Sequence, residues 1–304
     1  MAAVVWMLGA LLSLSLMAVG ARELSTEVNT FLTLFIRSVI GLLIISAVIL
    51  RAGGPRLFAT RRPRMQIVRN LFHFGGQYGW FVGIGLLPLA EVFALEFTVP
   101  FWVAVIAAMV LGERFTLRKT GALLLGVTGV LVILRPGTEI FDMASLVVLA
   151  AALSFSCAYV ATKSLSSTED PLTVLFYMCL VQMPVSLVLA LPHWELPTEP
   201  RLWAWLVVVG VTALTAHFCI THAMRRADAG VVVTLDFLRL PLIGLVGIMF
   251  YSEDFELYLL LGALFMLVGN LINIYRPAYQ RRMLAKLREE ELREEGLREE
   301  EADG

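Results

Sequence analysis

The stretch LAEVFALEFTVPFWVAVIAAMVLGERF, residues 89–115, decides how this chain must fold. It is longer than the roughly 20 apolar residues that a membrane-spanning helix needs, yet Glu96 and Pro100 lie inside it. A charged side chain at the centre of a bilayer costs about 2.5–3.5 kcal/mol on insertion scales. The stretch therefore combines a membrane span with a group that the membrane disfavours, which is typical of a functional position.

A second stretch repeats this pattern 140 residues later. Leu95–Phe97 (LEF) corresponds to Leu235–Phe237 (LDF), and Pro100 corresponds to Pro241 with a slip of one residue. Each half of the chain thus places a carboxylate and a proline inside an apolar span. Polar groups and helix breakers at matching positions of two halves indicate the substrate site of a membrane carrier.

The composition also favours a membrane protein. The 304 residues are 59% hydrophobic and 16% charged, with a mean hydropathy of +0.80, whereas soluble domains are about 45–50% apolar and about 25% charged. Cys157, Cys179 and Cys219 are scattered in apolar segments without CxxC spacing, so we interpret them as small hydrophobic residues. We expect no cofactor, no metal and no nucleic-acid partner.

Ten apolar segments of about the length of a spanning helix can be drawn along the chain. They fall at residues 3–20, 31–50, 66–87, 90–112, 118–134, 143–163, 171–191, 202–224, 229–251 and 256–275. Basic residues concentrate in the cytoplasmic loops of membrane proteins. Eighteen Lys and Arg lie in alternate loops and in the tail, whereas the opposite loops hold Arg22, Arg135 and Arg201. The distribution predicts ten transmembrane helices with both termini in the cytoplasm.

These segments predict an all-α integral membrane protein made of two inverted five-helix repeats. Because five is an odd number, the second half enters the membrane upside down relative to the first, as in many carriers. We assign residues 1–137 to the first repeat, 138–277 to the second, and 278–304 to a charged cytoplasmic tail. The Leu-Arg-Glu-Glu repeats of the tail favour a solvated helix.

The ordered set of short motifs resembles the EamA-type branch of the drug/metabolite transporter superfamily. The resemblance rests on residues 88–91 (PLAE), 111–114 (LGER), 121–129, 225–229 (RRADA) and 236–241 (DFLRLP). It implies a secondary carrier for small metabolites in a bacterial cytoplasmic (inner) membrane, often an exporter of amino acids or related compounds. One departure from the family pattern is Tyr251-Ser252-Glu253, where glycine is usual at the middle position.

Four charged residues inside segments are the first candidates for the site. Arg37 and Glu96 each lie six residues from the outer end of their segments, about 9 Å of helix rise, so an Arg37–Glu96 pair is possible. Asp236 and Arg239 are three residues apart and can pair on one helix. Both pairs could bind substrate or carry a coupling proton, or they could be neutralised structural pairs.

Further candidates are polar or aromatic side chains within the segments. His217 and His73 lie near the depth of Asp236 and could titrate near neutral pH, although a core histidine is the alternative. Tyr177 occupies the second-half position that corresponds to the helix of Arg37. An aromatic cavity wall would suit an organic cation or an aromatic amino acid, whereas lipid-facing packing is the other explanation. The candidate aromatic residues are Tyr78, Trp80, Trp102 and Tyr159.

The function predicted is secondary active transport of a small polar metabolite, such as an amino acid, a related zwitterion or an organic cation. We expect export by alternating access; proton-coupled uptake and passive facilitation remain alternatives. A membrane-embedded enzyme is disfavoured because the chain contains no HExxH, GxSxG or Walker-type sequence. The expected partners are the substrate and the lipid bilayer, and the chain could act as a monomer or a homodimer.

Overall fold

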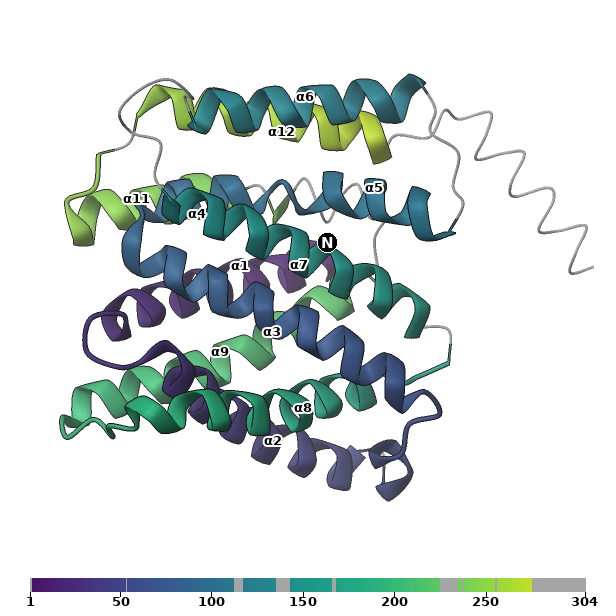
Figure 1. The fold of residues 1–304 in the computed structure, drawn as a ribbon, viewed down its shortest axis with the longest axis vertical. Helices are drawn as coiled ribbons and strands as arrows, with labels where there is room; N and C mark the ends of the chain where they lie inside the picture. Colours follow the sequence, from purple (N-terminus) through teal and green to yellow (C-terminus); the bar gives the residue numbers. More distant parts are fainter. Residues whose placement is uncertain are drawn as a thin grey trace, which may run out of the picture.

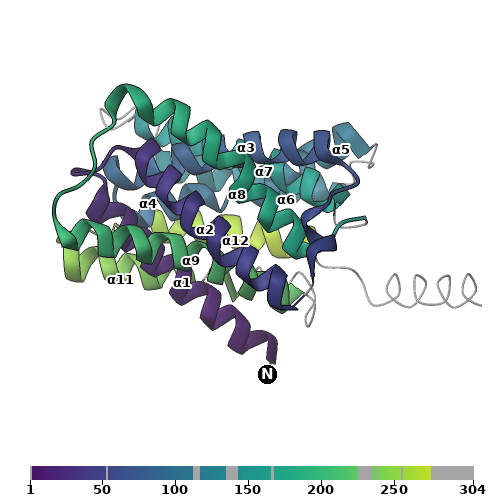
Figure 2. The same ribbon diagram turned by 90° about the horizontal axis from the view of Figure 1, so that it is seen from below.

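The computed structural model describes residues 2–52, 54–111, 117–134, 143–165, 168–224, 235–236, 238–254 and 256–274. Regular structure within these ranges is helical throughout. The predicted tail and the basic motif at residues 225–229 lie outside the described residues. Figures 1 and 2 show a bundle whose long helices run side by side in roughly one direction.

The helices match the apolar segments closely. The bounds are α1 Ala2–Leu24, α2 Thr30–Ala52, η1 Pro55–Phe58, α3 Pro63–Leu86, α4 Leu89–Glu96, α5 Val99–Leu111, α6 Leu117–Leu134, α7 Met143–Leu165, α8 Pro171–Ala190, η2 Leu191–His193, α9 Pro200–Met224, α11 Arg239–Tyr251 and α12 Leu257–Ile274. Among the described residues, α1, α2, α7, α8 and α9 are long and apolar enough to cross a membrane. The predicted segments 31–50, 143–163 and 171–191 agree with α2, α7 and α8 to within two residues.

The segment predicted at 90–112 is not one helix but two. The α4 helix ends at Glu96, and α5 begins at Val99. Proline has no backbone N–H, so Pro100 could not bond the carbonyl four residues earlier, but it is tolerated in the first turn of a new helix. Thr98 closes the break, because its backbone N–H and its hydroxyl both donate to Leu95 O, at 3.1 and 2.7 Å.

The second half contains a matching break. Residues 235–236 are helical, Leu238 lies in a turn, and α11 begins at Arg239. The Leu238 N–H donates to Leu235 O at 3.1 Å, the same bond as that from Thr98 to Leu95. Glu96 therefore ends α4, and Asp236 lies two residues before the turn at Leu238.

Helices pack mainly across the two halves of the chain. The principal neighbours are α1 with α9, α2 with α8, α3 with α7, α6 with α12, and α4 with α11, and Figure 1 shows α6 beside α12. In the α6–α12 pair the backbones touch, since a Cβ on Gly129 would lie 2.6 Å from Gly262 O. Small residues at such contacts allow close helix approach in membranes.

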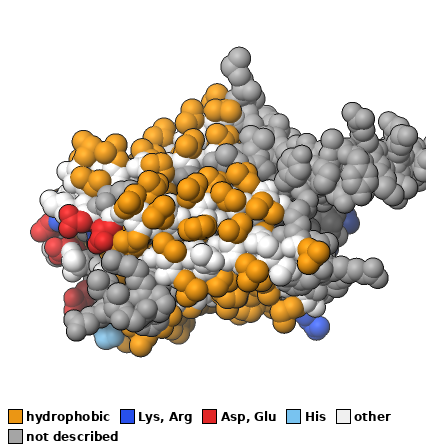
Figure 3. All heavy atoms as spheres, turned by 90° about the horizontal axis from the view of Figure 1, so that it is seen from above, with side chains coloured by type: hydrophobic (Ala, Val, Ile, Leu, Met, Phe, Trp, Pro, Cys, Tyr) orange, Lys and Arg blue, Asp and Glu red, His pale blue; other side chains and the backbone are white. Residues whose placement is uncertain are grey.

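The α4 helix is the centre of the core. Leu89, Val92, Phe93 and Leu95 are fully buried, and α4 contacts α3, α6, α7, α11 and α12. Large apolar side chains such as Leu8, Leu43 and Phe250 are instead exposed. Figure 3 shows hydrophobic side chains over the middle of one face and acidic side chains gathered at one end. An exposed apolar surface of this kind is expected where lipid surrounds the protein.

Candidate functional site

The two helix breaks meet in one ionic cluster. Arg239 Nη2 at the start of α11 donates to Glu96 Oε1 at 3.3 Å and to Asp236 Oδ2 at 3.1 Å. Trp80 Nε1 of α3 donates to Glu96 Oε2 at 2.9 Å. The Arg239 guanidinium lies over the ring of Phe93, 4.8 Å from its centroid. One arginine of the second half thus holds the acidic groups of both breaks.

The Arg37–Glu96 ion pair that the sequence left possible does not form between these two described residues. Glu96 pairs with Arg239, and no ion pair joins Glu96 to Arg37 in the part of the chain that the structure describes. The two residues were matched by depth, but α2 packs against α8 and α9, whereas α4 packs against α11 and α7. The Asp236–Arg239 contact has the i, i+3 geometry expected from the sequence.

Tyr159 of α7 faces the interior and yet is accessible. Its phenol interacts electrostatically with Glu96, Asp236 and Arg239 and, on its other side, with Arg69. These partners come from α3, from α4 and from the start of α11, so the side chain points towards other helices rather than lipid. It is nevertheless 53% exposed. From this exposure and these partners we infer an open space beside Tyr159, next to the acidic groups.

A second polar cluster lies on the other side of Tyr159. Arg69 of α3 donates from Nε to Thr162 Oγ1 at 3.0 Å and from Nη1 to Asn70 Oδ1 at 2.5 Å. Gln182 Nε2 of α8 donates to His73 Nδ1 at 2.9 Å. The ring of His217 from α9 lies 5.7 Å from that of His73, centroid to centroid. Arg69 and His73 are both buried.

Arg37 belongs to this second cluster. Its side chain interacts electrostatically with His73, His217 and Cys179, which come from α3, α9 and α8. Arg37 is only 5% exposed, and its buried Nε has no hydrogen-bond partner. Arg37 therefore lies with His73 and His217, two histidines that depth counting had placed near Asp236 rather than near Arg37.

The other predicted residues lie apart from these clusters. The Tyr177 hydroxyl donates to Phe58 O of η1 at 3.2 Å, so it ties α8 to the loop after α2. Tyr78 stacks on Phe31 with centroids 4.5 Å apart. Trp102 is half-buried, and its indole N–H finds no hydrogen-bond partner among the described residues. Of the four aromatic candidates, Trp80 and Tyr159 are the two that reach the ionic cluster.

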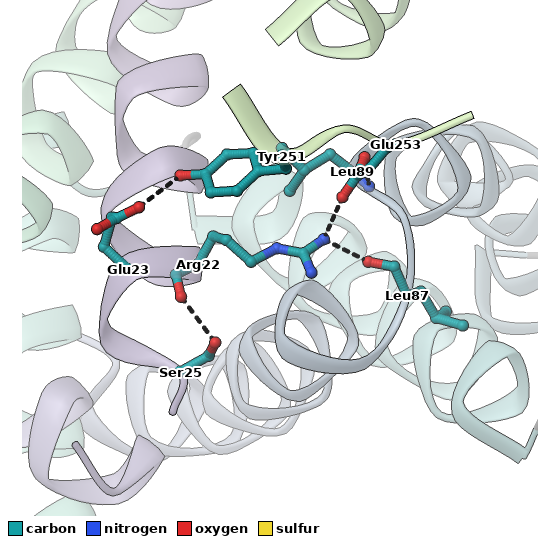
Figure 4. Close-up of polar contacts among 7 residues, drawn as sticks. All are labelled: Arg22, Glu23, Ser25, Leu87, Leu89, Tyr251 and Glu253. Carbon is teal, nitrogen blue, oxygen red and sulfur yellow. Dashed lines mark hydrogen bonds and ion pairs between the residues drawn. The ribbon is translucent and has the colours of Figure 1, made fainter. Parts of the chain in front are cut away.

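A third network ties the two halves together at the end of α1 (Figure 4). Arg22 Nη2 donates to Glu253 Oε1 at 2.7 Å and to Leu87 O at 2.5 Å, while Glu253 Oε2 accepts from the Leu89 N–H at 2.8 Å. Beside it, the Tyr251 hydroxyl donates to a carboxylate oxygen of Glu23 at 3.0 Å. We call the bonds of Arg22 and Glu253 the end latch.

The Arg22–Glu253 contact was not predicted from the sequence. The signal was the unusual Tyr251-Ser252-Glu253 ending of α11. Ser252 adopts a left-handed conformation with φ of 53°, the backbone region in which glycine is favoured. This turn directs Glu253 back towards α1 and the start of α4.

Comparisons with known proteins agree with this fold. A solved structure described only as "Crystal structure of protein" superposes with a TM-score of 0.65 at 20% identity, over 93% of this chain and 98% of its own. An S-adenosylmethionine uptake transporter of Rickettsia prowazekii is 26% identical over 89% of this chain and 91% of its own length.

Two further relatives are also named as transporters. A riboflavin transporter of Rhizobium johnstonii is 30% identical over 73% of this chain and 74% of its own. The pseudopaline exporter CntI of Pseudomonas aeruginosa is 27% identical over 84% of this chain and 89% of its own. Their names indicate transport rather than enzymatic catalysis, and these relatives are bacterial.

The family model described as the EamA-like transporter family matches residues 1–135 and again residues 142–275. Together with the apolar helices, this match identifies a multi-pass protein of a bacterial cytoplasmic membrane. The chain belongs to the EamA-like transporter family.

Proposed function

We propose that this protein is a secondary active transporter of a small polar metabolite, working by alternating access around the cluster of Glu96, Asp236 and Arg239. The observation that carries the proposal is the meeting of two helix breaks at one buried arginine. Discontinuous helices in secondary transporters place charged groups and free backbone at the substrate site. A charged cluster inside the membrane is otherwise expensive.

Two inverted five-helix repeats, residues 1–137 and 138–277, are part of the proposal. Three observations support them: the breaks recur after 140 residues, the family model matches the two halves separately, and helices pair across the halves. A two-fold axis in the membrane plane would explain the pairing, since it exchanges the α1–α9 contact with the α3–α7 contact. The ten crossings and cytoplasmic termini follow from the positive-inside count.

In the proposed transport cycle, the end latch closes one end of the protein. With the N-terminus in the cytoplasm, α1 ends at the outer surface, so Arg22 and Glu253 would close the outer end of the protein. The two residues are 231 positions apart, and their side chains are 20% and 13% exposed. A bond between the two halves at one end, with accessible Tyr159 deeper inside, is the arrangement expected of an inward-open conformation.

The substrate is proposed to be polar, because charged groups of both signs face the space beside Tyr159. Relatives are named for uptake of S-adenosylmethionine, for riboflavin, and for export of pseudopaline, so their names do not agree on direction. Export remains our prediction for this chain. Uptake is the second candidate, because the relatives named for uptake align over 89% of it.

Counterflow in proteoliposomes tests the proposal. Vesicles loaded with unlabelled S-adenosylmethionine or riboflavin, or with a bacterial metabolite extract, should accumulate the labelled form of the transported compound saturably. We expect Glu96→Gln and Asp236→Asn to abolish or uncouple transport while leaving a folded protein, and Glu195→Gln, on an exposed loop, to leave it unchanged. Wild-type rates and wild-type pH dependence in both acidic-site variants would refute a role for the cluster.

A further inference from the structure

Two buried arginines of the second polar cluster have no acidic partner among the described residues. Arg37 and Arg69 are each 5% exposed, and no carboxylate forms an ion pair with either within the residues that the structure describes. The Arg69 hydrogen bonds that the structure describes go to the neutral groups of Thr162 and Asn70. Buried charges in proteins are otherwise paired or bound to a counter-ion, so this pair of cations calls for a negative group.

Unused hydrogen-bonding groups lie along α3, the helix that carries Arg69. Within the described part of the chain, Arg37 Nε has no hydrogen-bond partner, and neither do the buried atoms Gln66 Nε2, Asn70 Nδ2 and Gln77 Oε1, all of α3. Native proteins leave few buried polar atoms unsatisfied, and each one calls for a missing ligand, ion or water. The donors among them, together with the guanidinium groups, form a lining suited to oxygen acceptors.

Charge is distributed unequally across the space beside Tyr159. On one side Glu96 and Asp236 share a single arginine, Arg239, so this side carries one negative charge when both acids are ionised. On the other side Arg37 and Arg69 carry two positive charges. Tyr159 interacts electrostatically with Glu96, Asp236 and Arg69 and is therefore positioned between the two clusters.

We propose that Arg37 and Arg69 form a subsite for the carboxylate of a zwitterionic substrate, whose cationic group lies across Tyr159 against Glu96 and Asp236. The inference rests on the proposed transport function and narrows its substrate class to molecules with an anionic group. Arginine suits this role because its planar fork binds a carboxylate through two parallel hydrogen bonds. An organic cation without an anionic group would leave the arginine pair uncompensated.

Equilibrium binding to the purified full-length protein tests the subsite separately from transport. The probes are two pairs that differ in one anionic group: S-adenosylmethionine with its decarboxylated analogue, and riboflavin 5′-phosphate with riboflavin. In at least one pair we expect the anionic member to bind wild-type protein about ten- to a hundredfold more tightly, the range of a charge-assisted hydrogen bond. Arg37→Gln should reduce that ratio to less than about threefold.

Matched variants separate recognition from folding. Arg51→Gln alters an exposed arginine at the other end of the same helix and should keep the wild-type ratio. If Arg37→Gln does not purify as a folded protein, Arg37→Lys keeps the charge but loses the fork, and an intermediate ratio is expected. A ratio near one in wild-type protein for both pairs, or a ratio unchanged in Arg37→Gln, would overturn the subsite, even if counterflow shows transport.

A lipid headgroup offers the same anionic chemistry and is distinguished by a second arm of the experiment. Binding is repeated in detergent with added phosphatidylglycerol. Displacement of the probe by this lipid in wild-type protein, lost in Arg37→Gln, would assign the arginines to a headgroup and overturn the substrate assignment. Undiminished probe affinity supports the carboxylate subsite. If a substrate binds equally well without Arg37 and still shows normal counterflow, the arginine subsite is refuted and the transport proposal is retained.

Discussion

Breaking the end latch should open the protein at the outer side. Glu253→Gln removes the charge that Arg22 Nη2 contacts at 2.7 Å, while the amide oxygen can still accept from the Leu89 N–H. The variant changes no residue of the polar clusters near Tyr159. Its effect on transport would therefore come from the balance between conformations rather than from lost substrate contacts.

The size of the effect follows from the exposure of the pair. Hydrogen bonds to charged groups contribute about 1.5–3 kcal/mol, but Arg22 and Glu253 keep 20% and 13% of their side-chain surface exposed, and solvent screening reduces this value. A loss of about 1–2 kcal/mol is reasonable. Because about 1.4 kcal/mol is a tenfold change in an equilibrium constant, the outward-open population should rise about 5- to 30-fold.

Thiol labelling from outside measures this population. Cys157, Cys179 and Cys219 are first replaced by alanine, and Tyr159→Cys then serves as the reporter inside the accessible space. A membrane-impermeant maleimide is added to right-side-out vesicles, and the initial labelling rate is compared with and without Glu253→Gln. The rate should rise by the same factor as the population, since labelling requires the outer end to be open.

The control is Glu199→Gln, which alters an exposed carboxylate 3.8 Å from Arg201 and should leave labelling unchanged. Arg22→Gln should raise labelling as Glu253→Gln does, and the double variant should add little to either single change. Equal labelling in Glu253→Gln and wild-type protein would refute the latch as a gate. Additive effects of the two single variants would refute the pairing as its physical basis.

Three other perturbations test separate parts of the structure. Arg37→Met should raise the melting temperature of the substrate-free protein, because a buried arginine without an acidic partner costs about 2.5–3.5 kcal/mol in a membrane helix. A melting temperature below that of wild-type protein would contradict the absence of such a partner. Trp80→Phe removes the 2.9 Å hydrogen bond to Glu96 and should weaken substrate binding about tenfold, measured at equal protein yield. Gly129→Val places a side chain against an α12 carbonyl and should cost about 1–3 kcal/mol in thermal unfolding, whereas Gly121→Val, with open space around it, should not.

The positions of the helices were predictable because an apolar run of fixed length is a local property of the sequence. The break after Glu96 was harder to predict. Pro100 was visible inside the span, but a proline can also kink a continuous helix without ending it. The structure shows that α4 ends at Glu96 and α5 begins at Val99, with Thr98 bonding back to Leu95. The second break, near Leu238, follows the same rule and could have been inferred from the first.

The Asp236–Arg239 contact within one segment could be read from the sequence, but the partners of charged residues on different helices could not. Counting along a segment gives the depth of Arg37 and Glu96 but not which helices are neighbours. The partner of Glu96 is Arg239, 143 residues away, and it is set by the packing of α4 against α11. The same limit hid the Arg22–Glu253 contact, whose members belong to opposite ends of the chain.

The pairing of helices across the halves restricts how this molecule can move. If the halves separated as two rigid blocks, α1 would lose α9, α2 would lose α8, α3 would lose α7 and α6 would lose α12, exposing all of these contacts at once. We therefore expect each pair to travel as a unit. The backbone at Thr98 and Leu238, where a bond to the third preceding residue replaces the regular helical bond, would then act as a pair of hinges. Bending at these hinges, rather than separation of two rigid halves, would exchange the open side.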